Sequence, residues 1–199
     1  MQFHTWEDLW LTDDRWIHKV TELKRQGLIH ALGISLNRWE TWNGVKTVES
    51  NVVDSVQVIY NIFDQNPKDE LFPACRKHDV AVIARVPFDE GTLTGTLTKA
   101  SRWPEGDWRN TYFVPENLHA SVERAEALKP LVPAGMMMAE MALRFILAEP
   151  TVSTIIPGMR KIKHVETNLA VSDTGQLDPA LLKELEKHRW DRKPTTWSQ

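Results

Sequence analysis

Cysteine is nearly absent from the sequence. Cys75 is the one cysteine among 199 residues, so no disulfide can form within them. Small secreted domains that depend on disulfides are therefore excluded as a class. The chain also opens without a basic and then apolar leader, and we expect a protein of the reducing cytoplasm.

An excess of one charge and a long apolar run are both lacking. The net charge is -3 and the isoelectric point is about 6.2, which leaves no basic field to attract nucleic acid or an anionic membrane. The most apolar run, residues 136–148, is interrupted by Glu140 and Arg144 and is too short to span a bilayer. Nucleic-acid and membrane partners are therefore not expected, and the run is predicted to be a buried helix.

Motifs for three other chemistries are missing. The histidines and the cysteine form no H-E-x-x-H or C-x-x-C spacing, so no metal site is expected. The segment GTLTGT, residues 91–96, has no lysine after its glycines and is not a P-loop. The segment GIS, which ends at Ser35, lacks the second glycine of a nucleophile elbow, so serine hydrolase chemistry has no support.

Short runs of β-branched residues alternate with amphipathic helical patterns along the chain. The opening segment MQFHTW is typical of the outer half of a strand, and further strands are expected at residues 29–35, 56–61, 80–85 and 152–157. Helices are expected at residues 12–27, 38–50, 69–78, 121–132, 136–148, 161–172 and 177–190. The pattern predicts one α/β domain, residues 1–199, with a parallel sheet whose strands are buried on both faces.

Two local signals add detail to this expectation. Asp178 and Pro179 are typical of a helix start, with the aspartate as the cap and the proline at the first helical position. Residues 87–115 form a long loop that contains two tryptophans. Loops of this length are usually functional or disordered, and the tryptophans argue against disorder.

Polar residues end each of the five expected strands. They are His4, Ser35 with Asn37, Gln57 with Asn61, Arg85, and Gly158 with Arg160. In α/β barrels the active site is assembled at the carboxyl ends of the strands. Five polar ends in one parallel sheet therefore predict a polar mouth.

The segment IIPGMRKIKH, residues 155–164, predicts an anion site. Gly158 follows a strand, and Arg160, Lys161 and Lys163 stand at the opening of a helix, where backbone N–H groups point outward. A single cation at a helix start usually does no more than face solvent. The three together, after the last strand, favour a bound phosphate.

The segments QFHTW, ALGIS, VQVIYNIFDQN, VIARVPFDEGTLTG and STIIPGMRKIKHVETN resemble, in order and spacing, the C-terminal portion of aldo-keto reductases. The resemblance covers essentially the whole chain. It implies a partial (β/α)8 TIM barrel in which the five strands are the fourth to eighth and the first strands are missing, so that MQFHTW is an internal strand of an N-terminally truncated domain. It also implies NADPH-dependent reduction of aldehydes and ketones to alcohols, with a small carbonyl compound as substrate and NADPH/NADP as cofactor.

The resemblance assigns residues around the nicotinamide. His4 is similar to the catalytic-site histidine that orients the substrate carbonyl. Ser35 and Gln57 match residues that hydrogen-bond the nicotinamide carboxamide. The family usually places an asparagine directly after this serine, whereas here Leu36 intervenes before Asn37.

The resemblance also assigns the rest of the cofactor site. Arg85 occupies the position where many members stack a tyrosine on the nicotinamide, and a guanidinium plane can stack there as well. The loop that folds over the pyrophosphate is represented by Gly91, Leu93 and Gly95. The contacts to the 2′-phosphate and the adenine are represented by Gly158, Arg160, His164 and Asn168.

Hydride transfer to a carbonyl also requires a proton donor, which the family supplies from a tyrosine tuned by a lysine and an aspartate upstream of the histidine strand. Tyr60 and Tyr112 are the two tyrosines here, and neither lies in the matching context. One hypothesis is therefore an aldo-keto reductase fragment that is inactive alone. The other is a non-catalytic module that binds nucleotide or pairs with another chain, and exposed sheet edges would let either one self-associate.

Overall fold

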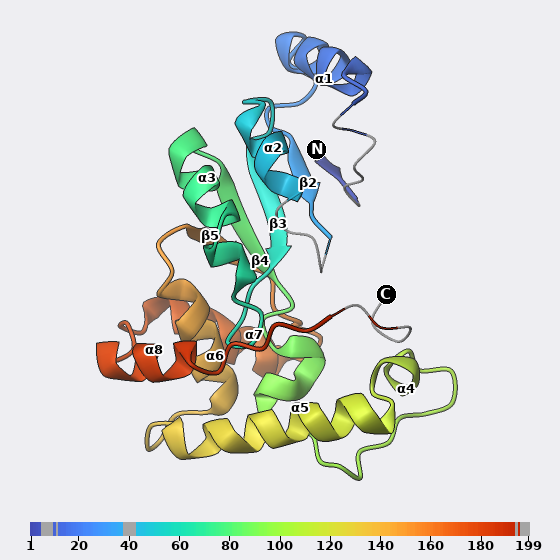
Figure 1. The fold of residues 1–199 in the computed structure, drawn as a ribbon. Helices are drawn as coiled ribbons and strands as arrows, with labels where there is room; N and C mark the ends of the chain where they lie inside the picture. Colours follow the sequence, from blue (N-terminus) through green and yellow to red (C-terminus); the bar gives the residue numbers. More distant parts are fainter. Residues whose placement is uncertain (5–9, 11, 38–42, 194, 196–199) are drawn as a thin grey trace.

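The computed structural model describes residues 1–4, 10, 12–37, 43–193 and 195. Within them, one parallel sheet has its strands in chain order (Figure 1). The strands are β1 (Gln2–Phe3), β2 (Gly33–Ser35), β3 (Ser55–Ile59), β4 (Ala81–Arg85) and β5 (Val152–Ile155). A doubly wound sheet would reverse its strand order at one point, whereas the wall of a barrel does not. The predicted parallel sheet is confirmed, with the strand order of a barrel wall.

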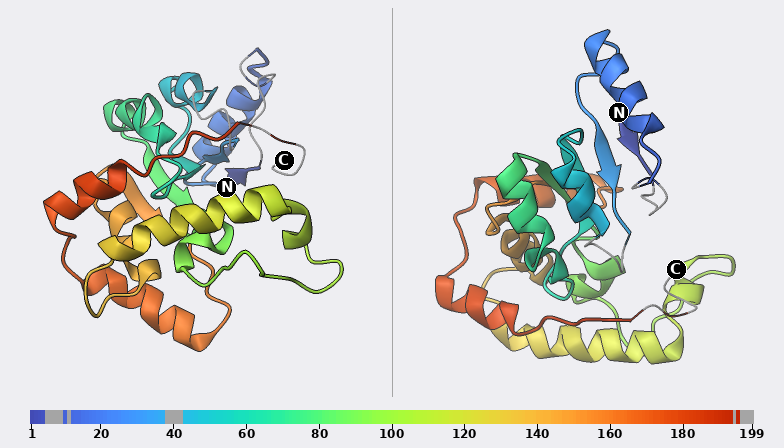
Figure 2. Two further views of the ribbon diagram at one scale, coloured as in Figure 1. Left: turned by 60° about the horizontal axis from the view of Figure 1, so that its bottom comes forward. Right: turned by 45° about the horizontal axis from the view of Figure 1, so that its top comes forward.

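The helices fall into two groups along the molecule (Figures 1 and 2). Near the N-terminus are α1 (Arg15–Arg25), α2 (Asn43–Glu49) and α3 (Leu71–His78). At the opposite end are α4 (Arg109–Tyr112), α5 (Pro115–Leu128), α6 (Met138–Leu147), α7 (Ile162–Ala170) and α8 (Pro179–Glu186). Short 3₁₀ turns lie between them: η2 (Asn66–Lys68), η3 (Asp89–Thr94), η4 (Lys129–Leu131) and η5 (Val171–Asp173). None of the described helices is long and apolar enough to cross a membrane.

The main core lies between the sheet and helices α2, α3 and α6. Its aromatic centre is Tyr60, whose ring centroid is 5.0 Å from that of Phe72 and 5.9 Å from that of Phe145. Strand residues such as Ile34 and Val58 are fully buried in the same cluster. The sheet and three helices from distant parts of the chain therefore share one core.

The long loop at residues 87–115 has its own packed structure. It contains η3 and α4, and the ring of Trp103 stacks on that of Phe113 at 5.1 Å between centroids. Phe113 belongs to a second cluster with Leu118 and Val122 of α5. The expectation that this loop is ordered is confirmed.

The expectation that every strand is buried on both faces is wrong. Ser153 and Thr154 of β5 are exposed, and Ile83 of β4 is half-buried. Among the described residues β5 pairs with β4 alone, so its outer edge has no strand partner. The inner face of a barrel wall becomes dry when the barrel closes around it, and this sheet is open.

Element lengths also differ from the sequence-based expectation. β2 has three residues instead of the seven at 29–35, and α5 begins at Pro115, ahead of the expected 121. Residues 5 and 6 of the opening strand and 38–42 of the second helix lie outside the described part of the chain. Asp178 caps α8 as expected, because its Oδ1 accepts from the N–H groups of Ala180 at 2.8 Å and Leu181 at 3.3 Å.

We expect Asp178→Ala to lower the free energy of unfolding by about 1 kcal/mol, because two N–H groups of the first turn of α8 lose their acceptor. Urea unfolding followed by circular dichroism measures the change. The matched control is Asp178→Asn, which keeps an acceptor oxygen and should cost clearly less. Equal losses in the two variants would contradict the capping role.

Candidate functional site

The polar strand ends lie along one edge of the sheet. Because all five strands are parallel, His4 after β1, Ser35 at the end of β2 and Arg85 at the end of β4 share the carboxyl edge. The Arg85 guanidinium reaches across this edge, with Nη2 donating to the Leu36 carbonyl at 3.2 Å. These polar strand ends therefore lie along one edge of the sheet, and the polar mouth stays a prediction.

Ser35 and Gln57 lie side by side, since the ladder of β2 and β3 pairs these two residues. Ser35 is fully buried, and its Oγ has no hydrogen-bond partner among the described residues. Gln57 is half-buried, and its Oε1 accepts from Gln2 Nε2 at 2.9 Å. A buried hydroxyl without a partner is unfavourable, and a polar ligand group such as a carboxamide would satisfy it. Asn37, also half-buried, lies two residues further along.

His4 is exposed at the end of β1 and directly precedes residues outside the described part of the chain. It lies at the same carboxyl edge as Ser35, since β1 pairs with β2 in parallel. The structure therefore places His4 on the same edge as Ser35 and Gln57.

The loop that holds Gly91, Leu93 and Gly95 follows β4. The φ angles of Gly91 and Gly95 are 113° and 71°, and a Cβ on Gly95 would lie 3.2 Å from the sulfur of Met138. Leu93 is fully buried, and so is Thr92, whose Oγ1 has no partner among the described residues. Glycine is thus required at both positions for conformation, and at Gly95 also for space.

Several backbone hydrogen bonds lie within this loop. The N–H groups of Gly91 and Leu93 donate to the Phe88 carbonyl at 2.9 Å, and the N–H of Gly95 donates to the Thr92 carbonyl at 3.1 Å. The Thr94 hydroxyl donates to the Gly91 carbonyl at 2.6 Å. The result is a compact turn at the carboxyl edge of the sheet.

Of the residues predicted to bind phosphate and adenine, Gly158 and Arg160 lie between β5 and α7, and His164 and Asn168 lie within α7. Gly158, Arg160 and His164 are exposed, whereas Asn168 is half-buried and lines a hollow of about 190 Å³ between α6, β5 and α7. Lys161 precedes α7 without capping it, so the first N–H groups of this helix have no side-chain cap. An uncapped helix start with nearby cations favours an anion.

Sequence reasoning missed an acidic residue near these cations. Asp107 accepts from Arg109 Nε at 2.8 Å, and the pKa of Asp107 is lowered to about 2, mainly by this arginine and further by the positive charge of Arg160. An aspartate is common in loops, and nothing in its local sequence marks it. The charge of Arg160 is thus partly offset by an anion.

The other reactive side chains are buried away from a ligand. Tyr60 is 1% exposed, and its pKa is raised first by burial and then by the charges of Glu149 and Glu186. The Tyr112 hydroxyl lies 3.4 Å from Arg192 Nη1. Burial raises the pKa of the Cys75 thiol to about 12, so this thiol stays protonated and unreactive at neutral pH.

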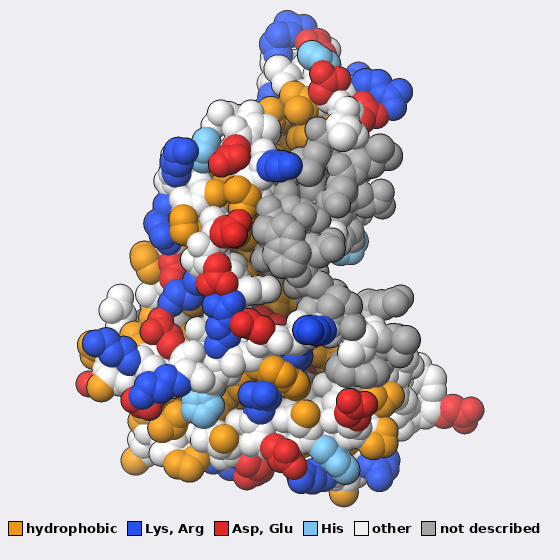
Figure 3. All heavy atoms as spheres, viewed as in Figure 1, with side chains coloured by type: hydrophobic (Ala, Val, Ile, Leu, Met, Phe, Trp, Pro, Cys, Tyr) orange, Lys and Arg blue, Asp and Glu red, His pale blue; other side chains and the backbone are white. Residues whose placement is uncertain are grey.

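The charges on the surface agree with the absence of a basic field. On the face in Figure 3, basic and acidic side chains are interspersed over the helices that are drawn. Within the described part of the chain, no three histidine, cysteine, aspartate or glutamate residues gather where they would hold a metal ion.

A model of the aldo/keto reductase family matches residues 1–189. The chain belongs to this family. It is similar to an uncharacterized oxidoreductase from Bacillus subtilis, at 30% identity over 178 residues that cover 88% of this chain and 55% of the relative. An NADH-specific methylglyoxal reductase from Escherichia coli is 27% identical over 170 residues, which cover 83% of this chain and 51% of the relative.

Solved aldo-keto reductases share the fold. The holo form of one from Bacillus halodurans superposes with a TM-score of 0.71 at 23% identity, covering 100% of this chain and 61% of that chain. A glycerol dehydrogenase from Gluconobacter oxydans superposes with a TM-score of 0.72 at 20% identity, covering 92% of this chain and 57% of that chain. The chain therefore has the α/β fold of aldo-keto reductases and spans about half the length of the curated relatives that it matches.

Proposed function

We propose that this chain carries the nicotinamide-nucleotide site of an NADPH-dependent aldo-keto reductase, as the C-terminal portion of the barrel. The observation that carries the proposal is the Ser35 hydroxyl, buried and without a described partner beside Gln57 at the carboxyl edge of the sheet. In a member of this family, that hydroxyl and that carboxamide suit the amide of a nicotinamide.

The proposed roles follow the order of the strands. Ser35 and Gln57, with Asn37, hold the carboxamide, and Arg85 offers a guanidinium plane beside the ring. His4 orients the substrate carbonyl. A reduced nicotinamide bound here would supply a hydride to that carbonyl.

The remaining roles concern the other end of the dinucleotide. The loop with Gly91, Leu93 and Gly95 covers the pyrophosphate. The contacts to the adenosine and its 2′-phosphate come from Gly158, Arg160, His164 and Asn168. The proposed contacts to the nicotinamide are buried, and those to the adenosine are exposed. This difference fits a dinucleotide whose nicotinamide end is inserted at the carboxyl edge of the sheet.

Neither tyrosine of this chain is placed to donate the proton that must accompany the hydride. Tyr60 is enclosed by Phe72 and Phe145, and Tyr112 faces Arg192. We therefore propose that the chain alone binds the cofactor without completing the reduction.

The choice of NADPH over NADH rests on Arg160 and the neighbouring cations. The relatives differ in their cofactor. One from Schizosaccharomyces pombe carries NADP(+) in its name, and the Escherichia coli enzyme is named as NADH-specific. Arg160 with Lys161, Lys163 and His164 can form charge-assisted hydrogen bonds to a 2′-phosphate, a group that NADH lacks.

We expect the chain to bind NADPH about tenfold more tightly than NADH, and Arg160→Met to remove this preference while leaving the NADH affinity unchanged, because the 2′-phosphate loses its charged donor. Fluorescence titration with both nucleotides gives the four dissociation constants. Arg15→Met is the matched control, since Arg15 is an exposed arginine of α1. Equal wild-type affinities, or a preference that survives in Arg160→Met, would remove Arg160 from the site.

We expect no measurable reduction of a simple aldehyde by the purified chain, because a missing general acid costs about 10²- to 10⁴-fold in rate. Loss of NADPH absorbance in the presence of excess aldehyde is the measurement. Nucleotide titration of the same sample separates an inactive site from an unfolded one. Turnover that disappears in Tyr112→Phe would show that the chain has its own proton donor.

The open edge of β5 favours a second candidate function, a module that pairs with another chain or with a second copy of itself. Thr154 is exposed on the strand, and Ile156, Met159 and Leu169 nearby are 47%, 40% and 58% exposed. An unpaired strand edge beside apolar side chains recruits further strands.

We expect the isolated chain to sediment as dimers or larger species at micromolar concentration, because strand pairing at β5 satisfies its outer edge. Thr154→Lys should shift the distribution toward monomer, since lysine on an edge strand opposes pairing. Analytical ultracentrifugation measures this, with Thr111→Lys on exposed α4 as the control. A monodisperse wild-type monomer would contradict the pairing hypothesis.

A further inference from the structure

The loop after β4 has an unfavourable backbone. Val86, Asp89 and Glu90 have φ angles of 54°, 46° and 57°, a region that non-glycine residues rarely adopt and that is least suited to a β-branched side chain such as valine. Gly91 continues the series at 113°. Such a conformation persists when surrounding contacts stabilise it.

One of these contacts comes from the end of β3. Asn61 is fully buried, and its Nδ2 donates to the Val86 carbonyl and to Asp64 Oδ2, each at 3.0 Å. Its Oδ1 accepts from the N–H groups of Phe63 and Asp64 at 2.8 and 3.0 Å. Asn61 thus joins the β3 end to the first strained residue of the loop.

The other contact comes from the C-terminal segment. Arg192 Nη2 donates to Asp64 Oδ2 at 2.5 Å and to Asp89 Oδ1 at 2.7 Å. The side chains of Arg192, Asp64 and Asp89 are 4%, 11% and 0% exposed. One buried guanidinium therefore connects the β3 end to the strained loop.

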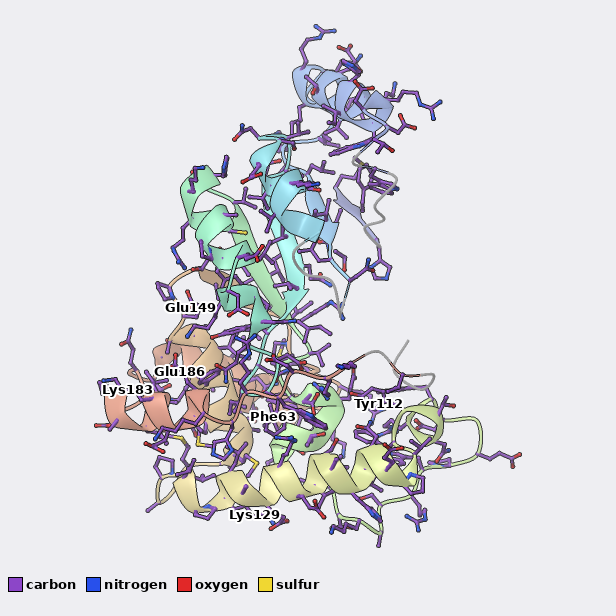
Figure 4. All side chains as sticks on the ribbon, viewed as in Figure 1. Phe63, Tyr112, Lys129, Glu149, Lys183 and Glu186 are labelled. Atoms are coloured by element: carbon purple, nitrogen blue, oxygen red, sulfur yellow. The ribbon has the colours of Figure 1, made fainter. Side chains whose placement is uncertain are left out.

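The C-terminal segment has further anchors of its own. It runs beside α5 toward α4 (Figures 1 and 2), and in Figure 4 it passes Phe63 and reaches Tyr112. The backbone N–H of Trp190 donates to the Phe63 carbonyl at 2.8 Å. The guanidinium of Arg124 lies 4.3 Å from the centroid of the Trp190 ring. Arg189 pairs with Asp69 at 2.6 Å. The segment is therefore fixed at several points besides Asp89.

We propose that Arg192 is a positioning residue that, by bridging Asp64 and Asp89, holds the loop of residues 86–95 in the conformation needed to cover a dinucleotide. The ligand in this proposal rests on the proposed function, whereas the holding of the loop rests on the contacts above. Arg192 touches neither Gly91 nor Gly95 and acts on them through Asp89.

The first test measures the loop without a ligand. Hydrogen exchange followed by mass spectrometry should show amides of residues 86–95 exchanging at least about tenfold faster in Arg192→Met than in the wild type. Arg189→Met is the matched control, because it removes an arginine of the same segment that contacts Asp69 and Asp191, not the loop. Unchanged loop exchange in Arg192→Met, or equal acceleration in Arg189→Met, would overturn the proposal.

A second pair of variants separates positioning from general stability and serves if Arg192→Met does not fold. Asp89→Asn weakens the loop side of the bridge and suits the left-handed backbone, whereas Asp64→Asn weakens the β3 side and keeps the pair of Arg192 and Asp89. Loop exchange should accelerate in both Asp89→Asn and Asp64→Asn, because each variant weakens one side of the bridge. Acceleration confined to residues 86–95 supports positioning, whereas unchanged loop exchange in Asp64→Asn, or equal acceleration throughout the chain, would overturn it.

The third measurement is NADPH dissociation by stopped-flow fluorescence. Arg192→Met should release NADPH about tenfold faster than Arg189→Met. Equal release rates would show that the loop does not affect cofactor binding and would overturn the proposal. If the wild type binds no NADPH, the proposed function fails, and the exchange pattern then decides on its own whether Arg192 positions the loop.

Discussion

The buried contact of Arg192 with Asp64 and Asp89 is the interaction on which the candidate site depends most. Burial opposes the charge of Arg192, while the Asp89 and Asp64 carboxylates raise its pKa, so the guanidinium stays charged. Removing one partner from a buried ion pair typically costs about 3–5 kcal/mol, because the remaining charge has left water without compensation. This contact joins three chain segments, namely the segment after β3, the loop with Gly91 and Gly95, and the C-terminal segment.

The strained backbone of that loop gives the contact its significance. A residue held in a sparsely populated region costs of order 1–3 kcal/mol, and Val86, Asp89 and Glu90 all have positive φ. Hydrogen bonds within the loop, such as Asp89 N–H to the Val86 carbonyl, are available to other conformations as well. The Asn61 and Arg192 contacts are not, because they require Val86 and Asp89 to be where they are. The loop conformation is therefore determined largely by residues outside the loop.

The sequence predicted those parts of the fold that depend on local patterns. The alternation of strands and helices, the cap at Asp178 and the parallel order follow from residue periods and from neighbours within a few positions. The common edge of the polar strand ends was predictable too, because parallel strands place their carboxyl ends on one edge. The burial of a strand depends on segments that are distant in sequence. The exposure of Ser153 and Thr154 was missed because it depends on what pairs with the outer edge of β5.

The contacts of Arg192 lay beyond prediction for the same reason. Arg192 is separated from Asp64 by 128 residues and from Asp89 by 103, and all three look like ordinary charged residues of loops. Trp190, expected as the end of the last helix, instead follows α8 in an extended segment and lies beside Arg124. Charged residues that pair across such distances carry no periodic signal, so a sequence pattern reveals the strand ends of a site more readily than the contacts that hold its loops.

The two ends of the candidate site also differ in physical character. At the nicotinamide end, Ser35 is fully buried, so a polar ligand group there exchanges hydrogen bonds with little competition from water. At the adenosine end, Arg160 is exposed, and Asp107 offsets part of its charge. Salt screens exposed charges over about 8–10 Å at physiological ionic strength and affects buried hydrogen bonds far less. In the proposed function, binding of a nicotinamide would thus depend on buried hydrogen bonds, whereas discrimination for a 2′-phosphate would be electrostatic and would weaken as ionic strength rises.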